Sequence, residues 1–136
     1  QFFIFLEYTP IQKGTDDWMV TLEQRKDLVS IMKDYQSKWP ALFMAVPSGE
    51  AEVGGCLAAG RGFVHVNANG DLEPCPFAPF SDSNIRKQPL KEALQSKLLA
   101  TLRRYPEELI PEEGGCVLWK KREWVESLLK DVKNQA

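Results

Sequence analysis

The chain has 136 residues, of which 43% are hydrophobic and 26% are charged, and its formal net charge at pH 7 is -2. This composition argues against disorder, and the length is sufficient to bury a core. No run of positive charges is longer than residues 120–122, and the apolar run at residues 41–46 is far shorter than the ~20 residues that span a bilayer. We therefore expect neither nucleic acid nor membrane as a partner.

A strand, a helix and a second strand are predicted for the first 46 residues. Residues 2–8 and residues 41–46 are almost continuously apolar, which is typical of strands covered on both faces. Between them, Thr21 and Gln24 have the spacing of a capping box, and apolar residues then recur at helical spacing until a proline ends the helix near Lys38. These elements predict one βαβ unit with parallel strands.

A β-hairpin is predicted after a change in composition. Residues 47–62 are rich in Gly, Ser, Glu and Ala, which marks a boundary. Polar and apolar residues then alternate as far as Asn67, and the Asn69-Gly70 dipeptide tolerates the positive φ angles of a tight turn. The returning strand places Cys75 at its far end.

Two further helical regions are predicted towards the end of the chain. Pro89 suits a first helical position, and leucines repeat every four residues up to about Arg104, with a break expected near Ser96. The leucines, which we expect in the core, are Leu90, Leu94, Leu98 and Leu102. One face of a terminal helix is formed by Leu118, Val125, Leu129 and Val132.

The three cysteines are the residues most suited to carry chemistry. Their odd number excludes a fully paired disulfide framework, so metal binding by a reduced, cytoplasmic protein is the better interpretation. Thiolates favour iron–sulfur clusters, zinc or copper(I). The hairpin turn brings the flanks that carry Cys56 and Cys75 together, while Cys116 arrives from a later loop. A pair of glycines precedes both Cys56 and Cys116, which lets backbone amides approach a cluster.

The arrangement of these residues resembles a known cluster-binding module. Cys56, Gly70 and Cys75 follow the pattern C-x13-G-x4-C, with a distant Cys116, and Asn84-Ile85 leads into the leucine-rich helix. This pattern is similar to the SPASM and twitch auxiliary-cluster modules of radical S-adenosylmethionine (SAM) enzymes. Upstream, Tyr8-Thr9-Pro10 and the helix that opens at Thr21 look like the closing βαβ portion of the partial TIM-like barrel in that family.

The resemblance implies an α/β (α+β) fold in three parts. Residues 1–49 would be the last strand, helix and strand of the barrel, residues 50–118 the cluster module with its β-hairpin and helix, and residues 119–136 a C-terminal helix. Cys56, Cys75 and Cys116 would bind an auxiliary [4Fe-4S] cluster. The cluster would position substrate or transfer electrons, and the intact protein would also bind SAM.

The resemblance also implies that this chain is not catalytic alone. The CxxxCxxC motif that binds the SAM cluster is absent, so we expect the chain to be part of a longer protein whose N-terminal barrel is its partner. The substrate, a peptide or a small molecule, is not indicated by any residue. Glu7 lies at the end of the first strand, where barrel enzymes place their active sites, although pairing within a loop is the favoured interpretation.

Three thiolates leave a four-iron cluster one ligand short. Substrate, water, a cysteine from elsewhere or a non-cysteine side chain would complete it. His65 is the only histidine, and a Cys3His zinc site is possible in principle. The hairpin alternation argues against this role because it places His65 with Phe63 and Asn67 on the exposed or interfacial face. The alternative function is a non-catalytic domain that binds zinc through the three cysteines, or binds no metal.

Overall fold

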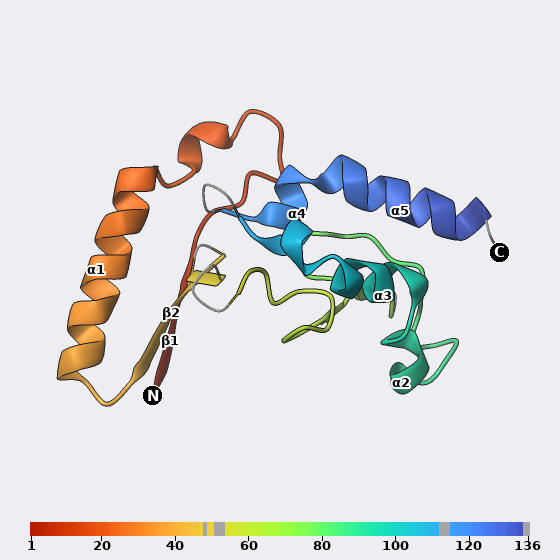
Figure 1. Cartoon of the computed structure of the whole chain (residues 1–136), viewed down its shortest axis with the longest axis horizontal. Coiled ribbons are helices and arrows are strands. Elements are labelled where there is room, and N and C mark those ends of the chain that lie inside the picture. Colours follow the sequence, from red (N-terminus) through yellow and green to blue (C-terminus); the bar gives the residue numbers. More distant parts are fainter. Residues whose placement is uncertain (48, 51–53, 112–114, 135–136) are drawn as a thin grey trace. The chain divides into compact units, whose positions relative to one another are not determined.

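A computed structural model describes residues 1–47, 49–50, 54–111 and 115–134 (Figure 1). The chain divides into two units, one of residues 1–56 with 110–117 and the other of residues 57–109 with 118–136. Within the described residues, no helix combines the length and the apolar composition that crossing a membrane requires. The fold is mixed α/β, with one parallel and one antiparallel two-stranded sheet, as expected in outline.

The first unit contains the predicted βαβ arrangement. Strand β1 (Phe2–Leu6) is followed by a short 3-10 helix, η1 (Asp16–Trp18), by helix α1 (Leu22–Lys38) and by strand β2 (Leu42–Val46). The strands are parallel and in register from the Phe2–Leu42 pair to the Leu6–Val46 pair. In Figure 1, α1 lies beside this strand pair. The predicted order and direction of the strands are confirmed.

Local hydrogen bonds explain where α1 begins and how the first strand ends. The Gln24 amide donates to the Thr21 hydroxyl at 3.2 Å, and the Thr21 amide donates to the Gln24 side chain at 2.8 Å, so the capping box is confirmed. Just after β1, Glu7 is buried and accepts a hydrogen bond from Arg25 Nε at 2.9 Å. Glu7 was expected to pair within a loop; it does form a pair, but its partner Arg25 belongs to α1.

The expectation that these strands are covered on both faces is wrong. Phe3 stacks on Phe43 with ring centroids 5.1 Å apart, and the ring of Tyr35 of α1 lies 5.8 Å from that of Phe43, so α1 packs on this face but leaves Phe3 45% exposed. Side chains alternate along a strand, and Ile4 and Leu6 of the other face are 51% and 74% exposed. The continuous apolar runs predicted packing on both faces of the sheet. In the described unit, one helix packs against the two strands, on one face only.

The second unit contains the predicted hairpin in a shorter form. Strands β3 (His65–Val66) and β4 (Leu72–Glu73) are antiparallel, and His65 is directly opposite Glu73. The Gly70 amide donates to the Asn67 carbonyl at 2.9 Å, and the Asn67 amide donates to the Asp71 carbonyl at 3.1 Å. The connection is therefore a three-residue loop in which Gly70 has a φ of 86°, rather than a two-residue turn with two positive φ angles.

The leucine-rich region forms two helices, which agrees with the break expected near Ser96. Helices α2 (Leu90–Ala93) and α3 (Lys97–Arg104) are separated at Ser96, whose side chain caps α3 by accepting from the Leu99 amide at 3.3 Å. The later elements are η3 (Pro106–Leu109), α4 (Val117–Lys120) and α5 (Arg122–Asn134). Pro89 lies one position before α2 rather than inside it.

The core of the second unit forms around α3, which contacts α5 and η3. Its fully buried side chains are Leu72, Leu98, Leu99, Leu102, Leu109, Leu118 and Val125. Leu90, which was expected in the core with the other leucines of its stripe, is 52% exposed. The helix break at Ser96 explains this difference, because a four-residue repeat keeps one face only along a continuous helix.

The two ends of the leucine stripe should therefore respond differently to truncation. Leu102→Ala removes a fully buried side chain, and we expect it to lower the free energy of unfolding by about 2–5 kcal/mol. Leu90→Ala is the matched control and should change it by less than about 0.5 kcal/mol. Urea unfolding followed by circular dichroism measures both values. Equal losses for the two variants would contradict the assignment of the core.

Candidate iron–sulfur cluster site

All three cysteines are buried, with exposed fractions of 4% for Cys56, 4% for Cys75 and 7% for Cys116. Cys56 and Cys116 belong to the first unit, and Cys75 belongs to the second. In the part of the chain that the structure describes, no three His, Cys, Asp or Glu side chains form a group that would hold a metal ion. The convergence of the three thiols on one cluster stays a prediction.

Two of the cysteines share a local backbone feature. Gly55, directly before Cys56, has a φ of 98°, and Gly115, directly before Cys116, has a φ of 73°. An L-residue with a side chain is strained in this left-handed region, whereas glycine is not. The glycine next to each of these cysteines is therefore required by the path of the chain.

Backbone hydrogen bonds fix the chain on both sides of Cys75. The Pro74 carbonyl accepts a hydrogen bond from the Ala59 amide at 3.1 Å, and the Ala78 amide donates to the Cys75 carbonyl at 3.0 Å. The second contact belongs to an isolated antiparallel bridge between Cys75 and Ala78, which turns the chain directly after the cysteine. Cys75 is thus placed between β4 and a tight turn.

A buried carboxylate joins the two strands of the hairpin. The Glu73 side chain is only 7% exposed, and its Oε1 accepts a hydrogen bond from Asn67 Nδ2 at 2.7 Å. Its Oε2 lies 2.9 Å from Nδ1 of His65. The prediction that His65 and Asn67 share one face of the hairpin is confirmed, but Glu73 was not singled out from the sequence.

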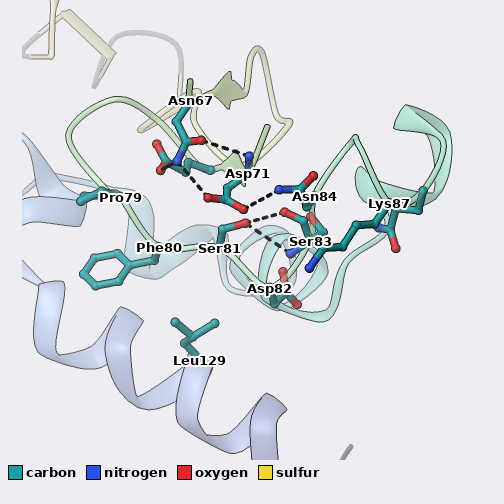
Figure 2. Close-up of a pocket in the computed structure, with 12 residues that line it drawn as sticks. Asn67, Asp71, Pro79, Phe80, Ser81, Asp82, Ser83, Asn84, Lys87 and Leu129 are labelled. Carbon is teal, nitrogen blue, oxygen red and sulfur yellow. Dashed lines mark hydrogen bonds between the residues drawn. The ribbon is translucent and has the colours of Figure 1, made fainter. Parts of the chain in front are cut away.

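A second carboxylate ties the hairpin turn to the segment that follows Cys75. Asp71 Oδ1 accepts from Asn84 Nδ2 at 2.8 Å, and Oδ2 accepts from Asn67 Nδ2 at 3.2 Å (Figure 2). The hydrogen bond from Asn84 has the larger effect and the one from Asn67 the smaller. Both lower the pKa of Asp71 below its ordinary value because they favour the ionised form. The side chain of Asn84 also donates to the Asn69 carbonyl at 3.1 Å.

This network borders a pocket of about 540 Å³ that lies wholly within the second unit. Figure 2 shows Phe80 and Leu129 beside a set of polar groups that includes Asp71 and Asp82. Asp82 Oδ2 accepts from the Leu98 amide at 2.9 Å, so this carboxylate also caps the start of α3. The pocket walls are therefore built largely from groups that hold the hairpin and α3 in place.

Comparison with known proteins assigns this part of the chain. Residues 56–116 match the family model described as SPASM, an iron–sulfur cluster-binding domain. This segment is similar to a SPASM domain. Over 67 residues the chain is also 39% identical to the AdoMet-dependent heme synthase of Methanosarcina barkeri (strain Fusaro / DSM 804), a match that covers 49% of this chain and 19% of that relative. No solved structure matches the chain.

The match to the SPASM model begins at Cys56 and ends at Cys116, and it includes Cys75. The resemblance inferred from the cysteine pattern is confirmed. Sequence reasoning named Asn67 and Asn84 but missed the two carboxylates that they bind, Asp71 and Glu73. The period-two spacing of Asp71 and Glu73 was the available signal, because it places two carboxylates on one face of a strand.

A substitution at Gly55 should strain the SPASM boundary. Gly55→Ala places a side chain at a φ of 98°, and we expect a loss of about 1–2 kcal/mol in the free energy of unfolding. Gly49→Ala is the matched control, because its added Cβ would meet only Ala45 Cβ at an ordinary 3.7 Å, and it should change stability by less than about 0.5 kcal/mol. Chemical denaturation of both variants distinguishes backbone strain from a general intolerance of alanine.

The role of Asp71 predicts a specific pH dependence. Its folded-state pKa lies below the ordinary value of 3.8, so the ionised carboxylate stabilises the folded state above that pH, and the contribution is lost as the pH falls through the folded-state pKa. Asp71→Asn should therefore be less stable than the wild type at neutral pH, and the difference should shrink below pH 3.8. Urea unfolding between neutral and acidic pH measures it. Asp131→Asn, at an exposed position, should show no such change.

Proposed function

We propose that this chain is the auxiliary-cluster region of a radical SAM enzyme and that Cys56, Cys75 and Cys116 hold a [4Fe-4S] cluster. The observation that carries the proposal is the SPASM match, which begins and ends at two of these cysteines and contains the third. The relationship to an AdoMet-dependent enzyme over half of the chain supports the same assignment. The match covers only 19% of that relative. The activity of the whole protein is therefore proposed as well.

The donor set fits an iron–sulfur cluster chemically. Thiolates are the usual ligands of such clusters. All three thiols are buried, which suits a cluster because its reduction potential depends on how far it is exposed to solvent. The left-handed glycines allow the backbone to approach closely beside Cys56 and Cys116. A bound cluster would supply either an electron-transfer centre or an open iron that positions substrate. The three cysteines would hold it and leave one iron without a thiolate.

The first unit supports a further part of the proposal. A parallel strand pair with a helix on one face is the repeating unit of a barrel. The opposite face carries the apolar side chains Phe2, Ile4 and Leu6, all about half exposed or more. We propose that this unit closes a partial TIM-like barrel and that the N-terminal barrel of the same chain covers the exposed face. That barrel would bind SAM and carry out the radical chemistry.

Further expectations about substrate, compartment and catalysis follow from this assignment. The substrate would be a peptide or a small molecule that reaches both the barrel and the cluster. The reduced thiols that a cluster requires favour the cytoplasm as the compartment. The chain by itself would hold the auxiliary cluster but would not generate a radical, since it lacks a CxxxCxxC motif.

Anaerobic reconstitution of the chain with iron and sulfide tests the proposal. The wild type should bind about four irons and four sulfides per chain, with the absorption and electron paramagnetic resonance signals of a [4Fe-4S] cluster. Each of Cys56→Ala, Cys75→Ala and Cys116→Ala should lose at least most of the bound iron. Leu90→Ala, at an exposed leucine, is the control and should assemble the cluster like the wild type.

Zinc separates this proposal from its alternative. A wild-type chain that assembles no cluster but binds one equivalent of zinc would contradict the proposal and support a structural zinc domain. Unchanged iron content in any one cysteine variant would remove that residue from the ligand set.

A further inference from the structure

His65 is held in one orientation by a buried charged group. Its Nδ1 lies 2.9 Å from Oε2 of Glu73, the carboxylate that is only 7% exposed. The other carboxylate oxygen is engaged by Asn67 Nδ2 at 2.7 Å. A carboxylate with both oxygens bound cannot rotate freely, so it restrains the side of the imidazole ring that carries Nδ1.

This hydrogen bond also determines which ring nitrogen is available. A carboxylate oxygen accepts, so Nδ1 carries the proton, and the lone pair of the neutral ring is on Nε2. The His65 side chain is 37% exposed, so the ring is not enclosed in the core. Histidines that bind metals almost always donate their other N–H to a carboxylate or a carbonyl group, which orients the ring. His65 has this arrangement.

The hairpin relates His65 to a proposed cluster ligand within the second unit. His65 is directly opposite Glu73 in the antiparallel register. Cys75 follows Glu73 by two positions, which is the spacing that keeps side chains on one face of an extended chain. Cys75 therefore lies just beyond the end of β4, in the arm of the hairpin opposite the one that carries His65.

A single metal ion would not use this pair alone, since no group of three such ligands occurs among the described residues. A four-iron cluster is different because each of its irons takes its own ligand, so the ligands are spread around a larger object than one ion. The three cysteines satisfy three of those irons. The fourth requires a donor that is not a cysteine of this chain, which contains only three.

We propose that His65 is the fourth ligand of the cluster, bound through Nε2 and positioned by Glu73. This inference rests on the proposed function and deepens it. An open iron would be filled by the protein rather than by substrate, so the cluster would act in electron transfer. A neutral imidazole in place of a thiolate makes the site less negative, which raises the reduction potential, as it does when histidine replaces cysteine in two-iron clusters.

The single histidine makes a direct test possible. The chain is produced with 15N-histidine, reconstituted, reduced and studied by pulsed electron paramagnetic resonance beside an unlabelled sample. We expect a strongly coupled nitrogen whose signal changes from the 14N to the 15N pattern. His65→Gln should lose this coupling, and His65→Cys should retain a four-iron cluster with a lower midpoint potential than the wild type.

The positioning role of Glu73 is tested in the same samples. Glu73→Gln keeps the size of the side chain but removes its charge, and it should weaken the nitrogen coupling and lower the fraction of chains with histidine-bound iron. Glu126→Gln, an exposed acid on α5, is the control and should leave both unchanged. Circular dichroism of each variant verifies that the fold is retained.

The outcomes separate this inference from the proposed function. A wild-type cluster without any histidine nitrogen coupling, or with a coupling that persists in His65→Gln, would overturn the inference and leave the cluster assignment intact. A wild-type chain that assembles no cluster would overturn both. A histidine coupling that disappears in His65→Gln and a potential that falls in His65→Cys would support His65 as the ligand.

Discussion

The buried carboxylate of Glu73 is the constraint on which the second unit depends. It connects β3 to β4 through His65 and accepts from Asn67 near the turn, two residues before Cys75. Burial of a carboxylate is unfavourable unless its oxygens are hydrogen-bonded. The contacts from His65 and Asn67 are therefore needed to stabilise Glu73 in this position. Through Asn67 the network continues to Asp71 and Asn84, which ties the segment after Cys75 back to the hairpin.

This network stabilises the hairpin beyond what its backbone pairing alone would achieve. Each strand has two residues, and an isolated two-stranded hairpin is marginally stable in water. Leu72 is fully buried, while Asp82 links the following loop to the start of α3. The cysteine at the end of the hairpin is therefore supported by polar contacts on one side and by apolar packing on the other.

The first unit has the opposite character. Its local elements are complete, with a capped helix and a parallel strand pair, yet one face of the sheet remains apolar and exposed. Exposed apolar faces of this kind mark interaction surfaces in soluble proteins. The two units thus combine a preformed hairpin that carries a cysteine with a sheet suited to packing against more protein, which agrees with the proposed place of this region in a larger enzyme.

Local physical chemistry in the sequence determined the elements. Thr21 and Gln24 marked the start of α1 and Ser96 marked the break in the leucine stripe, because caps and breaks depend on near neighbours. The spacing of Cys56, Gly70 and Cys75 indicated the similarity to SPASM domains through its resemblance to a known pattern. Burial depended on the tertiary structure. The exposure of Ile4 and Leu90 and the pairing of Glu73 with His65 depend on which segments pack together, and periodicity along one chain does not specify that packing.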